Sequence, residues 1–247
     1  MSKPNILRQF CTEPECCVDM CPSRIALYGF DGSGGRLAAA QIPNDYRNVT
    51  LQSSVAREDQ SSIYAALADY VKTFQRYFDG EPIKSVYLYS KTPGTGKTTT
   101  AAALLNEYIA RIYLGYLRRN RQAPQMMGYF ADVNSMQTDY NGFNRSHVPA
   151  SMAEEASERY YSAMASAKAA PYAVLDDIGV RDATEPFRAD LHDIINYRVT
   201  NRLPTVYTSN VKIDDLSQVF DARLADRVRD QCIVLPFGGE SKRGVRK

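Results

Sequence analysis

The 247-residue sequence lacks any apolar run that approaches the length of about 20 residues needed to cross a membrane. Its first residues, Met1-Ser2-Lys3-Pro4-Asn5, lack the apolar core of a secretion signal. These absences argue against a membrane protein and predict a cytoplasmic one. A strong net charge is missing too, because the formal value is only +2. Any surface for nucleic acid must therefore be local.

A phosphate-binding loop is predicted at residues 91–99, which read Lys-Thr-Pro-Gly-Thr-Gly-Lys-Thr-Thr. An apolar run at 86–89 precedes it and a run rich in alanine and leucine at 101–105 follows, so the pattern predicts a strand, a glycine-rich turn and a helix. Glycine suits such a turn because backbone N–H groups must point inward at phosphate oxygens, where a side chain would clash. The helix that follows directs its positive N-terminal end at the same anion.

Two side chains complete this predicted site. Lys97 supplies a charge for the β- and γ-phosphates, and the Thr98 hydroxyl can bind Mg²⁺. One position departs from the motif, because Lys91 stands where a glycine is usual. A Gly-Lys-Thr on a random loop would lack the strand before it and the helix after it, so we interpret the stretch as an ATP-binding loop. Its predicted ATP-binding residues are Pro93, Gly94, Thr95, Gly96, Lys97, Thr98 and Thr99.

Acidic side chains follow a second apolar run, at 172–175. Asp176 and Asp177 would lie at the carboxyl end of that strand, where α/β sheets bind nucleotides. We expect Asp176 to hold Mg²⁺ through water, and Asp177 to orient and polarise the attacking water. A further strand at 204–210 is expected to place Asn210 at the same edge as Asp177.

Strands alternate with helices along the chain, which predicts a parallel sheet with helices on both faces. The expected strands are 86–89, 127–133, 172–175, 204–210 and 231–236. The expected helices are 62–78, 98–119, 151–169, 185–201 and 222–230. The polar stretch 134–146 follows the second strand, and we expect it to bind single-stranded DNA through residues 140–145, where Tyr140 can stack on bases and Arg145 can meet the backbone. A plain surface loop is the alternative.

The cysteines are concentrated near the N-terminus, where Cys11, Cys16, Cys17 and Cys21 lie within one short segment. In a cytoplasmic protein such clustering argues for a metal site or reactive thiols rather than disulfides. Thiolates are soft ligands, and a set of this size suits tetrahedral Zn²⁺. The spacing is not that of a standard zinc knuckle, so an iron–sulfur cluster and plain thiols remain alternatives. Cys232 stands apart in an apolar run and is expected to be a small core residue.

The motifs resemble, in order, those of an AAA+ ATPase, and are most similar to the DnaC/DnaI type of bacterial and phage helicase loader. The resemblance covers residues 42–236 and includes an Ile-Pro-x-x-Tyr start at Ile42. The segments that carry it are 93–98 (Pro-Gly-Thr-Gly-Lys-Thr), 175–179 (Leu-Asp-Asp-Ile-Gly), 208–210 (Thr-Ser-Asn) and 226–229 (Asp-Arg-Val-Arg).

This resemblance implies roles for individual residues. Asn210 would sense the γ-phosphate, and Arg227 would be an arginine finger that reaches the ATP of a neighbouring subunit, with Arg223 as the second candidate. Asp177 stands where most AAA+ proteins have the longer glutamate, so we expect slow, switch-like ATP hydrolysis. The implied partners are a DnaB-type hexameric helicase, single-stranded DNA and further copies of the chain. A zinc-binding N-terminal domain, as in DnaI-type loaders, would accommodate the cysteines.

Together these features predict an α/β P-loop AAA+ domain at 41–247, with a five-stranded parallel sheet and no C-terminal lid, preceded by a small cysteine-rich domain at 1–40. The predicted function is ATP-dependent loading of a replicative helicase onto single-stranded DNA in replication initiation. The cofactors would be ATP, Mg²⁺ and Zn²⁺. The alternatives are a related transposition helper ATPase and a binding module that holds nucleotide without turnover.

Overall fold

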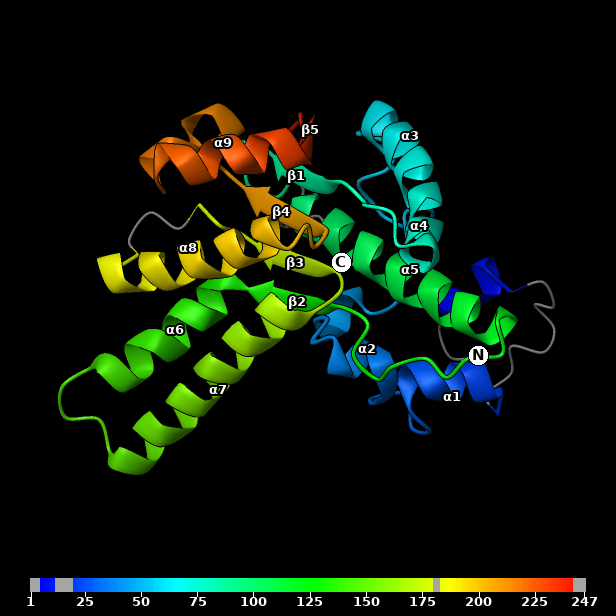
Figure 1. Cartoon of the computed structure of the whole chain (residues 1–247), viewed down its shortest axis with the longest axis horizontal. Coiled ribbons are helices and arrows are strands. Elements are labelled where there is room, and N and C mark those ends of the chain that lie inside the picture. The colour runs from blue at the N-terminus through cyan, green and yellow to red at the C-terminus, as the bar shows by residue number, and fades with distance from the viewer. Residues whose placement is uncertain (1–4, 12–19, 180–182, 242–247) are drawn as a thin grey trace.

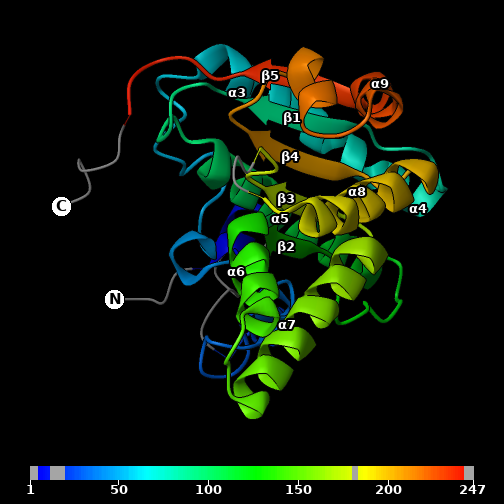
Figure 2. The ribbon, with the colours of Figure 1, turned by 90° about the vertical axis from the view of Figure 1, so that its left-hand side faces the viewer.

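The computed structural model describes residues 5–11, 20–179 and 183–241. At its centre is a five-stranded sheet in the order β2-β3-β4-β1-β5. Every neighbouring pair of strands is parallel, as predicted. Figure 2 shows the strands one below another from β5 to β2. The strands are β1 (Ser85–Tyr89), β2 (Tyr129–Asp132), β3 (Ala173–Asp176), β4 (Thr205–Ser209) and β5 (Cys232–Pro236).

Successive strand residues face opposite sides of the sheet, and each side carries its own core. Val86 and Leu88 of β1 belong to the core that contains α5 (Lys97–Arg118). Tyr87, between them, belongs to the other core, with α8 (Glu185–Thr200) and α9 (Ala222–Gln231). Both faces are therefore covered by helices, which explains why the strands read as continuous apolar runs rather than alternating ones.

The predicted helix at 62–78 is divided into three parts. It comprises α3 (Ser61–Tyr70), a 3₁₀ segment η4 (Val71–Gln75) and α4 (Arg76–Asp79). Within η4 the Thr73 hydroxyl donates to the Tyr70 carbonyl at 2.7 Å. Side-chain bonds of this kind compete with the regular backbone ladder of an α-helix. Gly80, with φ 69°, ends the unit.

The stretch 134–146 is mostly helical, so the alternative of a surface loop was wrong. It forms α6 (Val133–Asn144), which packs beside α7 (Ala150–Ala169) as a helical hairpin (Figure 1). The N-cap is Asp132, whose Oδ1 accepts hydrogen bonds from the backbone N–H groups of Asn134 and Ser135 at 3.0 and 3.3 Å. The capping residue is also the last residue of β2, where an acid fits a strand end, so the start of this helix was not predicted from the sequence.

The described N-terminal residues lie against α5. They form η1 (Ile6–Gln9), α1 (Pro22–Tyr28) and α2 (Gly35–Ala39). Leu7, Leu27 and Leu37 are buried in the same core cluster as α5. The Ala40 carbonyl accepts a hydrogen bond from the Phe130 N–H of β2 at 2.8 Å. The division of the chain at residue 40 stays a prediction.

The remaining short helical segments are η3 (Asn44–Tyr46) and η5 (Ile213–Gln218). Within the described ranges, no helix is both long and apolar enough to span a membrane.

Candidate nucleotide site

The glycine-rich turn between β1 and α5 has the backbone form that glycine permits. Gly94 and Gly96 have φ values of 79° and 100°, in the left-handed region. A Cβ atom on Gly96 would lie 2.4 Å from the Cβ of Ala56, so a larger residue would displace the chain there. The turn leads directly into α5, whose first residue is Lys97. The N-terminal end of α5 therefore faces the space in which a phosphate would be held.

Lys97 joins the ends of two strands. It is largely buried, and its Nζ donates to the Ser90 carbonyl after β1 at 3.3 Å and to Asn210 Oδ1 after β4 at 3.0 Å. Asn210 is thus at the edge where the sequence placed it. Thr95 and Thr99, also predicted to bind ATP, are buried around the same turn.

Asp176 lies between two hydroxyl groups. Thr98 Oγ1 donates to Asp176 Oδ2 at 3.2 Å, and Thr208 Oγ1 donates to Oδ1 at 2.7 Å. Burial raises the pKa of Asp176 to about 6, although both hydroxyls partly oppose the shift. The contact of a carboxylate with a threonine hydroxyl fits the oxygen ligands that Mg²⁺ prefers, so Thr98 and Asp176 could hold that ion.

Asp177 is placed by its backbone and by two amide groups. Its φ is 64°, and its N–H donates to Thr208 Oγ1 at 2.8 Å. Asn134 Nδ2, at the start of α6, donates to Asp177 Oδ2 at 3.1 Å. Asn210 Nδ2 lies 3.5 Å from the other carboxylate oxygen. These contacts turn the carboxylate toward the ends of β2 and β4, where it could accept a proton from a water molecule.

Asn134 is the site residue that the sequence analysis missed. The available signal was a polar side chain just after a strand, but such residues are common at strand ends. Only the neighbouring position of β2 and β3 in the sheet shows that Asn134 reaches Asp177.

Arg227 lies apart from this group, on α9. Its guanidinium donates to Asn196 Oδ1 at 2.7 Å and to Thr200 Oγ1 at 2.8 Å, both on α8. Arg223 and Arg227 line a surface pocket together with His192. The role of Arg227 toward a neighbouring subunit stays a prediction.

The cysteine cluster is only partly within the described residues. Cys16 and Cys17 lie outside them, whereas Cys11 is partly buried and Cys21 is buried at the start of α1. In the part of the chain that the structure describes, no group of three or more His, Cys, Asp or Glu side chains could hold a metal ion. Cys232 is a thiol in β5, and burial raises its pKa.

Comparison with known proteins places the chain near helicase loaders. The curated "Replicative helicase loader DnaI" of Bacillus subtilis (strain 168) is 23% identical over 216 residues, which cover 82% of this chain and 60% of that protein. The chain thus matches less than two thirds of the length of this relative. No family model matches the chain.

Solved structures share the fold. A crystal structure of DnaI has a TM-score of 0.55 and 21% identity, covering 84% of this chain and all of that chain. A crystal structure of the DnaC helicase loader also has a TM-score of 0.55, with 20% identity, covering 79% of this chain and all of that chain. The resemblance to DnaC/DnaI-type loaders, predicted from the motifs, is therefore confirmed, and the α/β fold with a five-stranded parallel sheet is the one that these proteins have.

Proposed function

We propose that this chain is an ATP-dependent loader of a replicative, DnaB-type hexameric helicase onto single-stranded DNA in replication initiation. The observation that carries the proposal is the meeting of Lys97, Thr98, Asp176, Asp177 and Asn210 at one edge of the sheet. The similarity to DnaI and DnaC directs it toward helicase loading rather than another use of ATP.

The site residues suit ATP hydrolysis. The turn at 93–96 would surround the phosphates, and Lys97 would bind their outer oxygens. Mg²⁺, held by Thr98 and Asp176, would neutralise charge on the phosphates. Asp177 would accept the proton of the attacking water, and Asn210, already bonded to Lys97, would lie near the γ-phosphate. The shorter reach of aspartate supports slow turnover that acts as a switch.

Two variants test the ATP site. Lys97→Ala should lose ATP binding, because no other cation replaces its contact with the phosphates. Asp177→Asn should bind ATP normally and lose turnover, because an amide is a much poorer proton acceptor. Binding measured by calorimetry and turnover measured by phosphate release separate the two effects. If Asp177→Asn lost both ATP binding and turnover, the role of Asp177 would instead be to bind Mg²⁺ or to stabilise the fold.

Co-purification with the cognate replicative helicase tests the proposed partner. We expect a complex of the helicase with several copies of this chain. This complex should form in the cytoplasm and bind single-stranded DNA. Capture of a transposase in place of the helicase would favour a transposition helper. If phosphate release stays at the background level both with and without single-stranded DNA, a binding module without turnover would be favoured.

We further propose that Cys11, Cys16, Cys17 and Cys21 hold one Zn²⁺ per chain. The support is their clustering in sequence and the soft character of thiolate ligands. Elemental analysis of protein purified without added metal should find zinc, and Cys11→Ser or Cys21→Ser should release it without loss of ATP binding. Iron in its place would indicate an iron–sulfur cluster, and neither metal would indicate plain thiols.

A further inference from the structure

The segment at residues 46–60 borders the phosphate-binding turn. Ala56 packs against Gly96 so closely that a Cβ atom on that glycine would clash with it. Nearby, a chain of hydroxyl groups joins Ser54, Tyr64 and Thr100, with O···O distances of 2.6 and 2.7 Å. Thr100 lies in the first turn of α5, so Ser54 is connected through Tyr64 of α3 to the same helix end that begins with Lys97.

Two adjacent side chains further along α5 hold the other end of this segment. Asn106 Nδ2 donates to the carbonyls of Tyr46 and Val49 at 2.7 and 2.8 Å. Glu107 Oε1 accepts the Leu51 N–H at 3.0 Å. Glu107 is buried, and its second carboxylate oxygen forms an ion pair.

The partner in this ion pair is Arg111, one turn further along α5. Its guanidinium lies 3.2 Å from Glu107 Oε2, and the Glu107 side chain is 5% exposed whereas the Arg111 side chain is 38% exposed. The ring of Phe10, from the N-terminal cysteine-rich segment, covers the same guanidinium, with 4.8 Å from Arg111 Cζ to the ring centre. Aromatic contacts of this kind are strengthened when water is excluded.

We propose that Phe10, Arg111 and Glu107 form a regulatory relay that couples docking of the N-terminal segment to ATP affinity. The inference rests on the proposed nucleotide site around Lys97. When Phe10 leaves Arg111, the guanidinium becomes hydrated and its hold on Glu107 weakens. The hydrogen bond from the Leu51 N–H to Glu107 then weakens. The packing of Ala56 against Gly96 of the phosphate-binding turn loosens as a result. A ligand that draws the N-terminal segment away from α5 would thereby lower ATP affinity.

Coupling between two sites is reciprocal. ATP binding should in turn stabilise the docked N-terminal segment. Hydrogen exchange of the Leu7, Arg8 and Gln9 amides in η1 should therefore slow when ATP is added. Glu107→Gln should abolish this slowing, because the amide can still accept the Leu51 N–H but carries no charge to hold Arg111.

The decisive measurement compares the Kd for ATP of Arg111→Ala with that of a matched control, Arg119→Ala. Arg119 also stacks on a phenylalanine, with its Cζ 4.0 Å from the Phe78 ring centre, at the far end of α5. Its side chain donates to the Gly115 carbonyl of the same helix, which lies outside the relay. Arg111→Ala should raise the Kd at least fivefold, and Arg119→Ala should change it less than twofold.

Three outcomes are informative. A rise of less than fivefold in Arg111→Ala, or an equal rise in Arg119→Ala, overturns the relay and leaves the nucleotide site intact. If Arg111→Ala does not fold, Glu107→Gln takes its place in the same comparison. Wild-type ATP affinity in Lys97→Ala would instead remove the proposed nucleotide site, and the relay with it.

Discussion

Asp176 is a carboxyl group whose surroundings make its ionisation costly. It is 8% exposed, and burial raises its pKa from 3.8 to about 6. A shift of this size corresponds to about 3 kcal/mol. Because the folded pKa lies above the unfolded one, the protonated form favours folding, and this contribution is complete below about pH 4 and lost as the pH rises through about 6. The site therefore carries a cost near neutral pH that a bound cation would offset.

We expect Asp176→Asn to be more stable than the wild type at pH 8 and of similar stability at pH 4. Between these pH values, the free energy of unfolding of Asp176→Asn should rise relative to the wild type by up to about 3 kcal/mol. The loss of one hydrogen bond from a hydroxyl group should reduce this gain by about 1 kcal/mol. Urea unfolding of both proteins without nucleotide measures it. A constant difference across the pH range would contradict the raised pKa.

The same residue should make Mg²⁺-dependent ATP binding sensitive to acid. Mg²⁺ requires the ionised carboxylate, so affinity in the presence of Mg²⁺ should fall as the pH drops below about 6, the pKa of Asp176. Binding in EDTA is the control and should change much less over the same range.

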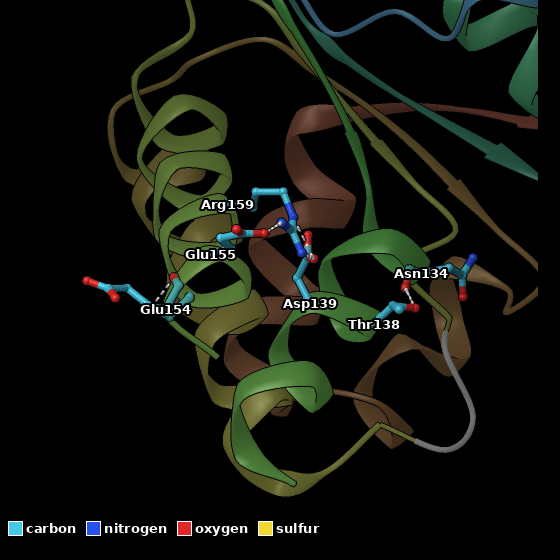
Figure 3. A network of polar contacts seen from close by, with 7 residues as sticks. Asn134, Thr138, Asp139, Glu154, Glu155 and Arg159 are labelled. Carbon is cyan, nitrogen blue, oxygen red and sulfur yellow. Dashed lines mark hydrogen bonds and ion pairs between the residues drawn. The ribbon is translucent and has the colours of Figure 1, made fainter. Parts of the chain in front are cut away.

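The α6–α7 hairpin shows how packing can remove an aromatic residue from a predicted binding surface. Tyr140 is half-buried, with ring centres 5.4 Å from those of Phe143 and Tyr160. Across the hairpin, Arg159 of α7 pairs with Asp139 of α6 at 2.8 Å, and within α7 it lies 4.0 Å from Glu155 (Figure 3). Tyr140 therefore helps to join α6 to α7, whereas Arg145, which follows α6, is exposed.

We expect Arg145→Ala to weaken binding of single-stranded DNA and to reduce its salt dependence by about one phosphate contact. Arg188→Ala, at an exposed position on α8, changes the net charge equally and is the control. Tyr140→Ala should mainly lower the free energy of unfolding, by about 2 kcal/mol, because it opens the aromatic cluster. Titration of labelled oligonucleotide at several salt concentrations is the measurement. Equal effects of Arg145→Ala and Arg188→Ala would mean that only general charge matters.

At the scale of the whole molecule, the predicted finger and the nucleotide site occupy different regions of one chain. Lys97 begins α5 after β1, whereas Arg227 lies on α9 and is bonded to α8. The contacts with Asn196 and Thr200 give Arg227 a structural role within its own chain. A role in hydrolysis would require a second chain.

Arg227→Ala should bind ATP normally but hydrolyse it about 10³-fold more slowly in the assembly, if it supplies charge to a neighbouring subunit's ATP. A purely structural role would instead cost about 1–2 kcal/mol of stability through two lost hydrogen bonds. Mixtures of Arg227→Ala and Lys97→Ala chains distinguish these cases. Recovery of phosphate release would show action between chains, and its absence in mixtures that co-assemble would exclude it.

The sequence by itself determined the features whose cause is local. Glycine at 94 and 96 was required by backbone conformation, and α5 was located within one residue at each end because its alanine- and leucine-rich run is continuous. Continuous apolar runs located the strands, and the acids at the end of β3 followed directly from one of them.

Tertiary structure decided which distant residues meet. Asn134 lies 43 positions before Asp177, and Glu107 lies 56 positions after Leu51, yet each pair forms a hydrogen bond. Such pairs leave no periodic pattern, because they depend on the order of strands in the sheet and on the packing of segments against α5. The same packing placed Tyr140 in the hairpin and Arg227 against α8, where local sequence had suggested exposed side chains.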